Sequence, residues 1–441
     1  MILSYLRSSA CILFQNMNIL LVNPWIYDFA AYDFGIKPVG LLRVGEYLRR
    51  RGNEVQLVDC LEGCATKRDR HGFSKIKKEE VRKPAAVRTV RRPFFRYGVS
   101  LSEFDSRLER IKNVDEIFVT SGMTYWYPGV QLAIALLKER FPGANVTLGG
   151  CYATLCHAHA SSTSGAHKVW KGDYPGASHG AGDFYPAYDL LVDKGLLPIQ
   201  LTRGCPFRCS YCASHLLAPA FTVSDPAALF AEVMRYRTAF GTKRFVFYDD
   251  ALAHRSDEGL KIFLRMVVQS GPDITFYTPN GIHARFIDEE LAELMMKAHF
   301  REVRLSAETT DESLQRSTGG KVTTSELTTA LKVLKNAGCR EGDLGVYLMI
   351  GAPWLDIENT MRDIEFVHSL GAKVDLASYS PIPGTKDYED LVASGTIAAD
   401  LDPLWHNKSI FADLLDSSYS EKVREVRLYV SKLNRAIDEY R

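Results

Sequence analysis

The sequence predicts an α/β protein built from two consecutive parallel-sheet domains, the first doubly wound and the second a partial βα barrel, followed by a C-terminal helical tail. Two observations predict this class. Short apolar runs typical of buried parallel strands alternate with stretches of helical periodicity. The alternation breaks off near residue 183 and resumes near residue 199, so two domains are expected, and 441 residues are enough for both.

The first domain is predicted over residues 17–182. Its expected strands are 18–24, 54–60, 116–122 and 145–150, with helices over 39–52 and 128–143. Strands that end in small or polar residues describe an open Rossmann-like sheet, whose ligands bind beyond the carboxyl ends of the strands. The residues at those ends are Ser121, Gly122, Thr124, Gly149 and Gly150.

A strongly basic insertion, residues 66–98, interrupts this domain. Its many lysines and arginines and few acids favour a solvated, partly disordered excursion. The alternative is a cover over an anionic cofactor or substrate. No repeat or stacking pattern accompanies the charge, so a nucleic-acid partner is not expected.

Two further segments lie outside the domains. Residues 1–16 are interpreted as a leader or as the product of a misassigned start, because Met17 opens the first expected strand. A lipoprotein-like signal around Cys11 is the alternative, although its apolar core is short. Residues 183–198 are expected to form the linker to the second domain.

The second domain is predicted over residues 199–390. Six apolar runs separated by helical segments are its expected strands: 199–204, 244–250, 274–281, 302–309, 345–353 and 373–381. Six such units form a (βα)6 partial TIM barrel, and barrel enzymes carry out chemistry in the loops that follow the strands. The C-terminal extension, residues 391–441, ends in an amphipathic helix that is expected to pack on the rest of the protein.

Composition argues against several classes of protein. The formal net charge is +1, which gives the chain no overall bias toward nucleic acid or membranes. The apolar runs before Met17 fall short of the roughly 20 residues that a membrane span needs. Nine cysteines, an odd number, and no convincing secretion signal argue for reduced thiols and a cytoplasmic location.

Three cysteines lie close together after the first expected barrel strand. Cys205, Cys209 and Cys212 are spaced C-x3-C-x2-C, with no fourth cysteine nearby in the sequence. A structural zinc site takes four protein ligands, so zinc would need a distant residue such as His215. Three thiolates suit an iron–sulfur cubane in which one iron stays open to a substrate or cofactor.

The residues around these cysteines, "TRGCPFRCSYC" (202–212), resemble the signature of the radical S-adenosylmethionine (radical SAM) superfamily. Later elements resemble it in the same order: "YDD" (248–250), "RLSAET" (304–309), "GAPWLD" (351–356) and "PIPGT" (381–385). The resemblance implies a [4Fe–4S] cluster on the three cysteines. It also implies S-adenosylmethionine contacts from Tyr211, Asp249, Asp250, Arg304, Ser306, Glu308 and Gly351. Trp354 stands where the family commonly has glycine, which is a departure near the adenine.

The first domain resembles the cobalamin-binding domain of one large radical SAM subfamily. The likeness rests on "KPVGLLRVGEYLRRRG" (37–52), "SGMTYWYPG" (121–129) and "LGGCYAT" (148–154). It implies a cobalamin beside Ser121, Gly122, Thr124, Gly149 and Gly150. The D-x-H-x-x-G motif that ligates cobalt in other cobalamin enzymes is absent, as it commonly is in this subfamily. The alternative is a degenerate Rossmann-like domain that has lost the cofactor.

The resemblance implies an enzyme whose cluster is reduced by an external donor of flavodoxin or ferredoxin type and cleaves S-adenosylmethionine to a 5′-deoxyadenosyl radical. The expected function is a cobalamin-dependent C-methyltransferase that acts on an unactivated carbon of a small-molecule or peptide substrate. One alternative is a non-methylating rearrangement or cyclisation, and another is a non-catalytic cobalamin or redox sensor. A tRNA methylthiotransferase fits poorly, because Cys60 and Cys64 do not complete the additional cysteine triad of that group.

Overall fold

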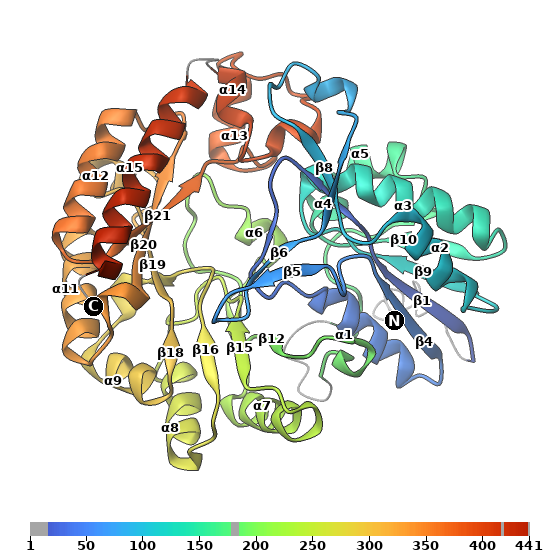
Figure 1. Cartoon of the computed structure of the whole chain (residues 1–441), viewed down its shortest axis with the longest axis horizontal. Coiled ribbons are helices and arrows are strands. Elements are labelled where there is room, and N and C mark those ends of the chain that lie inside the picture. The colour runs from blue at the N-terminus through green and yellow to red at the C-terminus, as the bar shows by residue number, and fades with distance from the viewer. Residues whose placement is uncertain (1–15, 178–184, 416–418, 440–441) are drawn as a thin grey trace, which may run out of the picture.

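The computed structural model describes residues 16–177, 185–415 and 419–439. Within them the chain forms two units, each built on parallel strands, that lie side by side (Figure 1). The predicted leader falls outside the described residues except for Asn16, and so does the predicted boundary at residues 182 and 183. No helix in the described ranges is long and apolar enough to cross a membrane.

The first unit contains a five-stranded parallel sheet in the order β11-β10-β9-β1-β4. Its strands are β1 (Asn18–Asn23), β4 (Glu54–Asp59), β9 (Glu116–Val119), β10 (Asn145–Leu148) and β11 (Lys168–Val169). Its helices are α1 (Val39–Arg49), α2 (Leu101–Glu109), α3 (Tyr127–Arg140), α4 (Cys151–Leu155) and α5 (His157–Thr163). The predicted Rossmann-like sheet is confirmed, with the short edge strand β11 in addition.

Burial on both faces explains why β1, an inner strand of the sheet, is almost wholly apolar. Along β1, Leu20 and Val22 pack into one hydrophobic core, whereas Ile19 and Leu21 pack into another on the opposite face. Because the strands are parallel, their carboxyl ends form one edge of the sheet. The residues predicted to bind cobalamin follow β9 and β10 at that edge.

The basic insertion is ordered, so the expectation of a partly disordered excursion is wrong. It forms β5 (Ala65–Arg68), β6 (Ser74–Ile76), β7 (Lys78–Val81), the 3-10 helix η1 (Ala85–Val87) and β8 (Phe94–Tyr97). With β2 (Ile26–Asp28) and β3 (Tyr32–Asp33), these strands build two antiparallel sheets, β2-β8-β7 and β3-β6-β5. Buried apolar residues among the basic ones supply the core that order requires: Phe73, Ile76, Phe94 and Tyr97.

The tip of the β5–β6 hairpin enters the second unit. Phe73 packs in one buried cluster with Val246 and Tyr277, and its ring centroid lies 5.4 Å from that of Tyr277. Beside it, His71 Nε2 is 3.1 Å from a carboxylate oxygen of Glu302. The insertion therefore joins the two units by filling part of the barrel interior.

The second unit is the expected (βα)6 partial barrel, built from two parallel sheets in the orders β12-β15-β16-β18 and β17-β19-β20-β21. Its strands are β12 (Leu196–Ile199), β15 (Arg244–Phe247), β16 (Thr275–Tyr277), β17 (Ile282–His283), β18 (Phe300–Arg301), β19 (Val303–Glu308), β20 (Leu344–Ile350) and β21 (Lys373–Ser378). The helices outside them are α7 (Pro226–Phe240), α8 (Leu260–Ser270), α9 (Glu289–Lys297), α11 (Thr324–Asn336) and α12 (Ile357–Ser369) (Figure 1).

Capping residues in the sequence set the bounds of these helices. The Asp225 carboxylate accepts a hydrogen bond from the Ala227 N–H at the start of α7, and Gly241 ends that helix in the left-handed conformation. Thr323 and Glu326 form a capping box at the start of α11. These signals account for where both helices begin and for where α7 ends.

The first barrel strand differs from its predicted range, 199–204. β12 ends at the first residue of that range, and Thr202–Arg203 form a separate strand, β13, which pairs antiparallel with β14 (Thr222–Val223). The Leu201 N–H donates to Asp249 Oδ1 at 2.9 Å instead of to a neighbouring strand. The Asp249 side chain thus replaces a neighbouring strand as hydrogen-bond partner, and the backbone leaves the sheet just before the cysteine loop.

Residues along β19 alternate between two environments. Its odd-numbered residues, from Val303 to Ala307, belong to the hydrophobic core beneath the outer helices. Its even-numbered residues, Arg304, Ser306 and Glu308, therefore point toward the inside of the barrel. The predicted contacts on this strand share one face.

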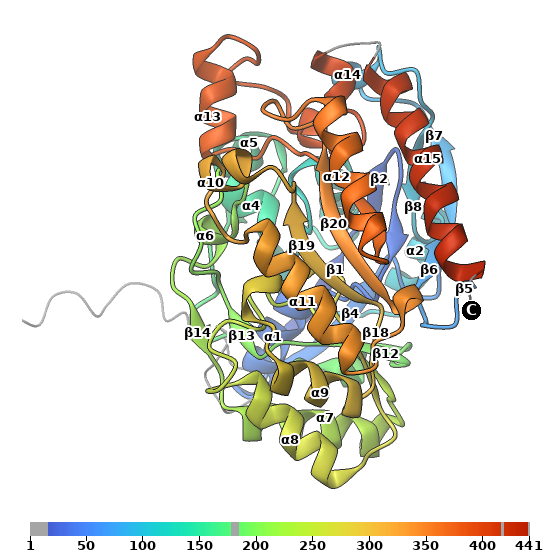
Figure 2. The same cartoon turned by 90° about the vertical axis from the view of Figure 1, so that its left-hand side faces the viewer.

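The C-terminal extension is only partly helical. After α13 (Lys386–Ala393) the chain forms the 3-10 helix η6 (Pro403–His406), α14 (Phe411–Leu415) and α15 (Tyr419–Glu439). α15 packs against α12 and β21, as the predicted amphipathic helix should (Figure 2). The segment around η6 instead packs on the first unit, where Leu404 and Ile410 join its core. The extension therefore ties the two units together.

Candidate active site

The three cysteines occupy a loop that is held from several sides. Gly204 opens the loop with a φ of +75°, and a Cβ there would come within 2.5 Å of the Ala220 carbonyl oxygen. The Ser210 N–H donates to Thr318 O at 3.0 Å, and Ser210 O accepts from the Asp387 N–H at 3.0 Å. The segment after α10 (Glu312–Ser317) and the start of α13 thus hold the loop in place.

The three thiols are free and influence one another. Burial raises the pKa of Cys205 to about 11, and the charges that Cys212 and Cys209 carry as thiolates add to that shift. Burial also raises the pKa of Cys209, while the ammonium of Lys321 opposes the shift. Without a cation to stabilise the thiolates, the loop therefore favours thiols over thiolates.

The donor set fits a cluster better than a single ion. In the described part of the chain, no three histidine, cysteine or acidic side chains converge on one ion-binding point. A zinc site made by the three cysteines and His215 would need such convergence. A cubane binds each thiolate to a different iron, so three separated thiols on one loop suit it.

A buried lysine lies beside the cysteine loop. Lys321 Nζ is 2.5 Å from Glu308 Oε1, and both side chains are 12% exposed. The same ammonium is 5.7 Å from the centroid of the Tyr211 ring. Burial disfavours its charge, but Glu308 and then Cys209 outweigh burial and raise the pKa of Lys321. Lys321 is therefore a fixed positive charge next to the thiols.

Glu308 has a strained backbone. Its φ is +68°, and it lies at an irregularity in the pairing of β19 with β20. A residue with a side chain adopts this conformation only when its surroundings impose it, and such strain gathers at functional sites. The ion pair with Lys321 is the contact that fixes the Glu308 side chain here.

His283 lies on the other side of the loop. Its Nε2 is 4.0 Å from Cys205 Sγ, and its ring stacks on Phe207 with centroids 5.1 Å apart. Burial, with smaller effects of Lys321 and His254, lowers the pKa of His283 to about 3. The imidazole is therefore neutral, and its Nδ1 has no hydrogen-bond partner among the described residues.

The two aspartates after β15 have different environments. Asp249 is 2% exposed, and its Oδ1 accepts hydrogen bonds from the Leu201 N–H and the Thr202 hydroxyl, both at 2.9 Å. Burial raises the pKa of Asp249 to about 7. Asp250 is exposed, although surrounding protein raises its pKa, and Ser214 partly offsets that effect by hydrogen bonding. Asp249 anchors the loop, whereas Asp250 is accessible to a ligand.

Other predicted contacts lie near the same loop. Ser306 pairs in register with His283, on the strand beside it. The ring of Tyr211 lies 6.2 Å from that of Trp354, which occupies the unusual position noted in the sequence. Gly351 follows β20 with a φ of +81°, a conformation that glycine adopts readily.

Arg304 lies at the other end of β19 from Glu308. Its guanidinium pairs with Asp375 and with Glu302, each at 2.5 Å. Both partners lie at the amino-terminal ends of barrel strands, on the side away from the cysteines. These contacts do not support its predicted role in binding S-adenosylmethionine, and that role stays a prediction.

Ser121, Gly149 and Gly150 form a compact corner at the carboxyl edge of the first sheet. Ser121 Oγ donates to Gly149 O at 2.8 Å and accepts from the Tyr152 N–H at 3.2 Å. Gly150 has a φ of +93°, and a Cβ there would lie 2.4 Å from the Ser121 carbonyl oxygen. A Cβ on Gly149 would meet nothing within 4 Å. The Gly149 backbone therefore faces open space.

The other two residues predicted to contact cobalamin differ in exposure, because Gly122 is exposed and Thr124 is buried. Thr124 is 6% exposed, and its Oγ1 is 3.2 Å from His406 Nδ1 in the C-terminal extension. A Cβ on Gly122 would come within 2.9 Å of the Trp126 ring. The exposed backbone of this edge is therefore at Gly122 and Gly150, with Gly149 half-buried between them and the sheet.

This edge meets the cysteine loop. α4, which begins directly after Gly150, contacts α6 (Ser214–Leu217), which follows Cys212. Burial and then the charge of Asp250 raise the pKa of the Cys151 thiol to about 11. The carboxyl edge of the first unit and the mouth of the barrel therefore face each other.

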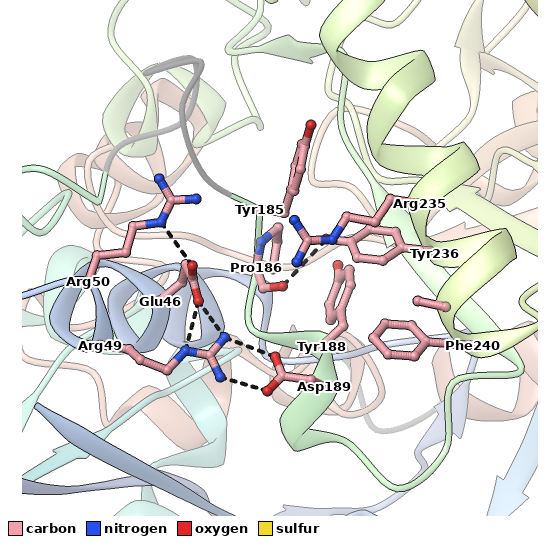
Figure 3. Close-up of a pocket in the computed structure, with 11 residues that line it drawn as sticks. Glu46, Arg49, Arg50, Tyr185, Pro186, Tyr188, Asp189, Arg235, Tyr236 and Phe240 are labelled. Atoms are coloured by element: carbon pink, nitrogen blue, oxygen red, sulfur yellow. Dashed lines mark hydrogen bonds and ion pairs between the residues drawn. The ribbon is translucent and has the colours of Figure 1, made fainter. Parts of the chain in front are cut away.

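A cavity of about 330 Å³ lies elsewhere between the units, lined by α1, the segment after residue 184 and α7 (Figure 3). Its arginines already have partners: Arg49 pairs with Glu46 and, at 2.6 Å, with Asp189, and Arg50 pairs with Glu46 at 2.9 Å. The cavity lies at the end of α7 that leads into the start of β15, away from the cysteine loop. It belongs to the packing of the two units.

The comparison with known families matches the barrel. Residues 199–364 match the model of the radical SAM superfamily. This part of the chain is a radical SAM superfamily domain. The match includes all three cysteines and every predicted S-adenosylmethionine contact, which agrees with the resemblance of the motifs.

Two relatives of the chain are named as uncharacterized methyltransferases. The one from Pyrococcus horikoshii is 26% identical over 223 residues, which are 48% of this chain and 47% of the relative. The one from Synechocystis is 30% identical over 162 residues, which are 35% of this chain and 30% of the relative. The chain thus spans about half the length of these relatives or less.

Solved radical SAM structures share the fold of both units. TsrM from Kitasatospora setae, a radical SAM methyltransferase with tryptophan substrate and a SAM analog bound, has a TM-score of 0.61 at 14% identity and covers 86% of this chain and 76% of its own. OxsB, a cobalamin-dependent radical SAM enzyme with aqua-cobalamin bound, has a TM-score of 0.54 at 12% identity and covers 93% and 57%. At these identities the likeness concerns the fold alone.

Sequence reasoning missed three residues of the candidate site. The motifs do not single out these residues, which are Lys321, His283 and Ser214. Lys321 contacts Glu308 and His283 contacts Cys205, so both contacts join separate segments of the chain. Ser214 contacts Cys212 within the cysteine loop itself. The one available signal was the short run "TGGK" (318–321), where a lysine follows two glycines beside a predicted site strand.

Proposed function

We propose that this chain is a radical SAM enzyme that uses cobalamin to methylate an unactivated carbon of its substrate. The supporting observation is the contact between α4 and α6. It joins the Gly149 edge to the loop of Cys212, so cofactors bound at these two points would share one substrate between them. Neither cofactor site alone would favour methylation over other radical chemistry.

In this proposal Cys205, Cys209 and Cys212 hold a [4Fe–4S] cluster. Once reduced by an external flavodoxin- or ferredoxin-type donor, such a cluster supplies the electron that cleaves S-adenosylmethionine to a 5′-deoxyadenosyl radical. Lys321 offsets the negative charge of the thiolates from within the protein. His283 covers Cys205 as a neutral group and adds no charge.

The same mouth offers groups for S-adenosylmethionine. Asp250 is an accessible acceptor for the ammonium of the ligand, and Glu308 is an acceptor for its hydroxyl groups. Tyr211 and Trp354 present neighbouring aromatic rings to the adenine. Asp249 acts indirectly, because its carboxylate holds the backbone from which the cysteine loop starts.

Cobalamin fits the Gly149 side of the first unit. With no side chain at Gly149 and open space beside it, the backbone can approach a large planar ring closely. The loop after β1, residues 24–38, contains no histidine that could ligate cobalt. When bound, cobalamin supplies a transferable methyl group. The names of the relatives as methyltransferases support this outcome over a rearrangement.

The deciding experiment follows the methyl group. The full chain is purified anaerobically with iron, sulfide and cobalamin, then incubated with a reductant, methyl-deuterated S-adenosylmethionine and small-molecule extracts. We expect both 5′-deoxyadenosine and a product that carries the labelled methyl group on carbon. The Cys209→Ala variant, which removes one thiolate, is expected to form neither.

Other outcomes identify the alternatives. Formation of 5′-deoxyadenosine with no labelled product in any extract would assign a rearrangement or cyclisation. Tight binding of cobalamin and iron without any 5′-deoxyadenosine would favour a sensor. If the protein binds a full complement of iron but no cobalamin, the first unit is a degenerate Rossmann-like domain that has lost the cofactor.

A further inference from the structure

Three cationic side chains from distant parts of the chain gather near the barrel mouth. Arg92 comes from the basic insertion, Lys408 from the segment after η6, and Arg427 from α15. Arg427 Nη2 donates to Ser378 Oγ at 2.7 Å, and Ser378 is the last residue of β21. Arg92 Nη1 donates to the carbonyl oxygen of Ser409 at 2.5 Å, directly after Lys408.

Lys408 has no hydrogen-bond or ion-pair partner within the described residues. Its side chain is exposed, and yet surrounding protein lowers its pKa through desolvation. Asp28 opposes this shift and Arg427 adds to it. An accessible ammonium that is partly desolvated and lacks a carboxylate partner gains from binding an anion.

The guanidinium of Arg427 is also partly desolvated and has no carboxylate partner among the described residues. Burial lowers its pKa, and the nearby charge of Arg92 lowers it further. The contacts of Arg427 and Arg92 are with a hydroxyl, a carbonyl oxygen and, for Arg92, the ring of Phe29 at 5.8 Å. None of these partners carries a negative charge.

The nearest acids do not neutralise this group. Asp28 is 3% exposed, and its carboxylate accepts hydrogen bonds from Asn407 and Trp126, each at 2.8 Å, while burial raises its pKa. Burial raises the pKa of Asp413, and the charge of Arg92 opposes this only in part. No ion pair joins the two side chains. Among the described residues, no carboxylate lies within ion-pair distance of the three cations.

The position of the cations relates them to both cofactor sites. Ser378 ends β21 at the barrel mouth, one strand from Gly351 after β20. On the other side, His406 and Asn407, next to Lys408, contact Thr124 and Asp28 of the first unit. The cationic group therefore lies where a substrate between the two units would end.

We propose that Lys408, Arg427 and Arg92 bind an oxyanion group of the substrate, a phosphate or a carboxylate, and so hold its reacting carbon at the mouth. Three converging cations without an acid match such a group in charge, and arginine matches its geometry. This inference rests on the proposed function, because it assigns a substrate class to that site. It also gives a role to the contact between the basic insertion and the segment around η6.

The test measures anion binding separately from catalysis. The anaerobic full chain, with its cofactors, is titrated with inorganic phosphate or with acetate by calorimetry, at constant ionic strength set with chloride. We expect saturable binding of one of the two, which identifies the group as phosphate or carboxylate. Lys408→Gln and Arg427→Gln should each weaken it by about tenfold, as expected for one charge-assisted hydrogen bond. Lys432→Gln, an exposed lysine on α15, is the matched control and should bind like wild type.

Two results would overturn the assignment: no saturable binding of either anion, or binding that Lys408→Gln and Arg427→Gln leave unchanged. Cleavage of S-adenosylmethionine by the wild-type chain is measured in parallel. Anion binding that depends on both residues, without any cleavage, would reject the proposed function but keep the anion site. Cleavage without such binding would reject the anion site alone.

Discussion

Lys321 and Glu308 form an ion pair in which Nζ and Oε1 are 2.5 Å apart, and each side chain is only 12% exposed. The pair adjoins Cys209 and Tyr211, so it connects the backbone strain at Glu308 to the cysteine loop. A buried pair of this kind is costly to break, because the remaining partner becomes an isolated charge.

We therefore expect Lys321→Met to lower the free energy of unfolding by about 3–5 kcal/mol. Glu308→Gln should have an effect of the same sign, since it leaves the buried Lys321 ammonium without its carboxylate partner. The double variant should lose less than the sum of the two, because neither partner is left alone. Urea unfolding of the anaerobic wild type, the two single variants and the double variant measures these free energies. Lys386→Met breaks the exposed pair with Asp390 and serves as control; equal losses for both pairs would contradict the prediction.

The cysteines provide a second prediction. Replacing Cys205, Cys209 or Cys212 by alanine should reduce bound iron to background, because each thiolate would bind a different iron of the cluster. Cys339→Ala, a buried cysteine elsewhere in the barrel, should keep its iron. Iron and sulfide analysis, together with an absorption spectrum, measures how much cluster each variant binds. A triple-alanine variant with a full complement of iron would reject the site.

Local patterns were sufficient to predict much of this architecture. The cysteine spacing and strand ends needed only short-range sequence, and the alternation of apolar runs and helices predicted both parallel sheets. The even-numbered residues of β19 fall on one face because strand geometry has a period of two. Ser306, Glu308 and Arg304 were instead predicted from the resemblance of "RLSAET" (304–309) to the family motif.

The remaining features depend on contacts between distant segments. Phe73 is one of several apolar residues in a basic run, and its packing on Tyr277 in the second unit helps to order the insertion. The overall composition of the insertion does not reveal the effect of a single apolar residue. It therefore led to the wrong prediction of partial disorder. Lys408 and His406 likewise owe their positions to the first unit, which begins more than half the chain earlier. Nothing near them in sequence indicates that docking.

The buried carboxyl group of Asp249 predicts a pH dependence. Burial raises its pKa to about 7 from an ordinary value of 3.8, so between these values the folded state binds more protons than the unfolded state. Its contribution to stability is therefore complete below about pH 4 and is lost as the pH rises toward 7. Asp249→Asn keeps an acceptor for the Leu201 N–H but cannot ionise.

Relative to wild type, Asp249→Asn should thus gain on the order of 1–3 kcal/mol in unfolding free energy between pH 5 and 7.5. Urea unfolding at several pH values measures this difference. Asp105→Asn, an exposed aspartate on α2, is the control and should follow the wild-type profile. Parallel profiles for Asp249→Asn and wild type would show that the carboxylate is stabilised by other groups.

The adjacent glycines at the edge of the first sheet separate a folding role from a binding role. Gly150→Ala places a Cβ 2.4 Å from the Ser121 carbonyl oxygen at a φ of +93°, and should cost about 1–3 kcal/mol in stability. Gly149→Ala meets nothing within 4 Å, so the fold should tolerate it. Its methyl group would nevertheless enter the space proposed for cobalamin, and we expect weaker cobalamin uptake at unchanged unfolding midpoint.

Gly143→Ala, which also meets nothing within 4 Å but lies before β10 at the opposite end of the sheet, should alter neither property. Cobalamin content after reconstitution, read from the absorption spectrum, and the urea midpoint are measured for all three variants. The contrast matters because a destabilised variant can lose a cofactor for trivial reasons. If Gly149→Ala retains wild-type cobalamin while its stability is unchanged, the ring does not lie against Gly149, and the proposed cobalamin site must be placed elsewhere on the first unit.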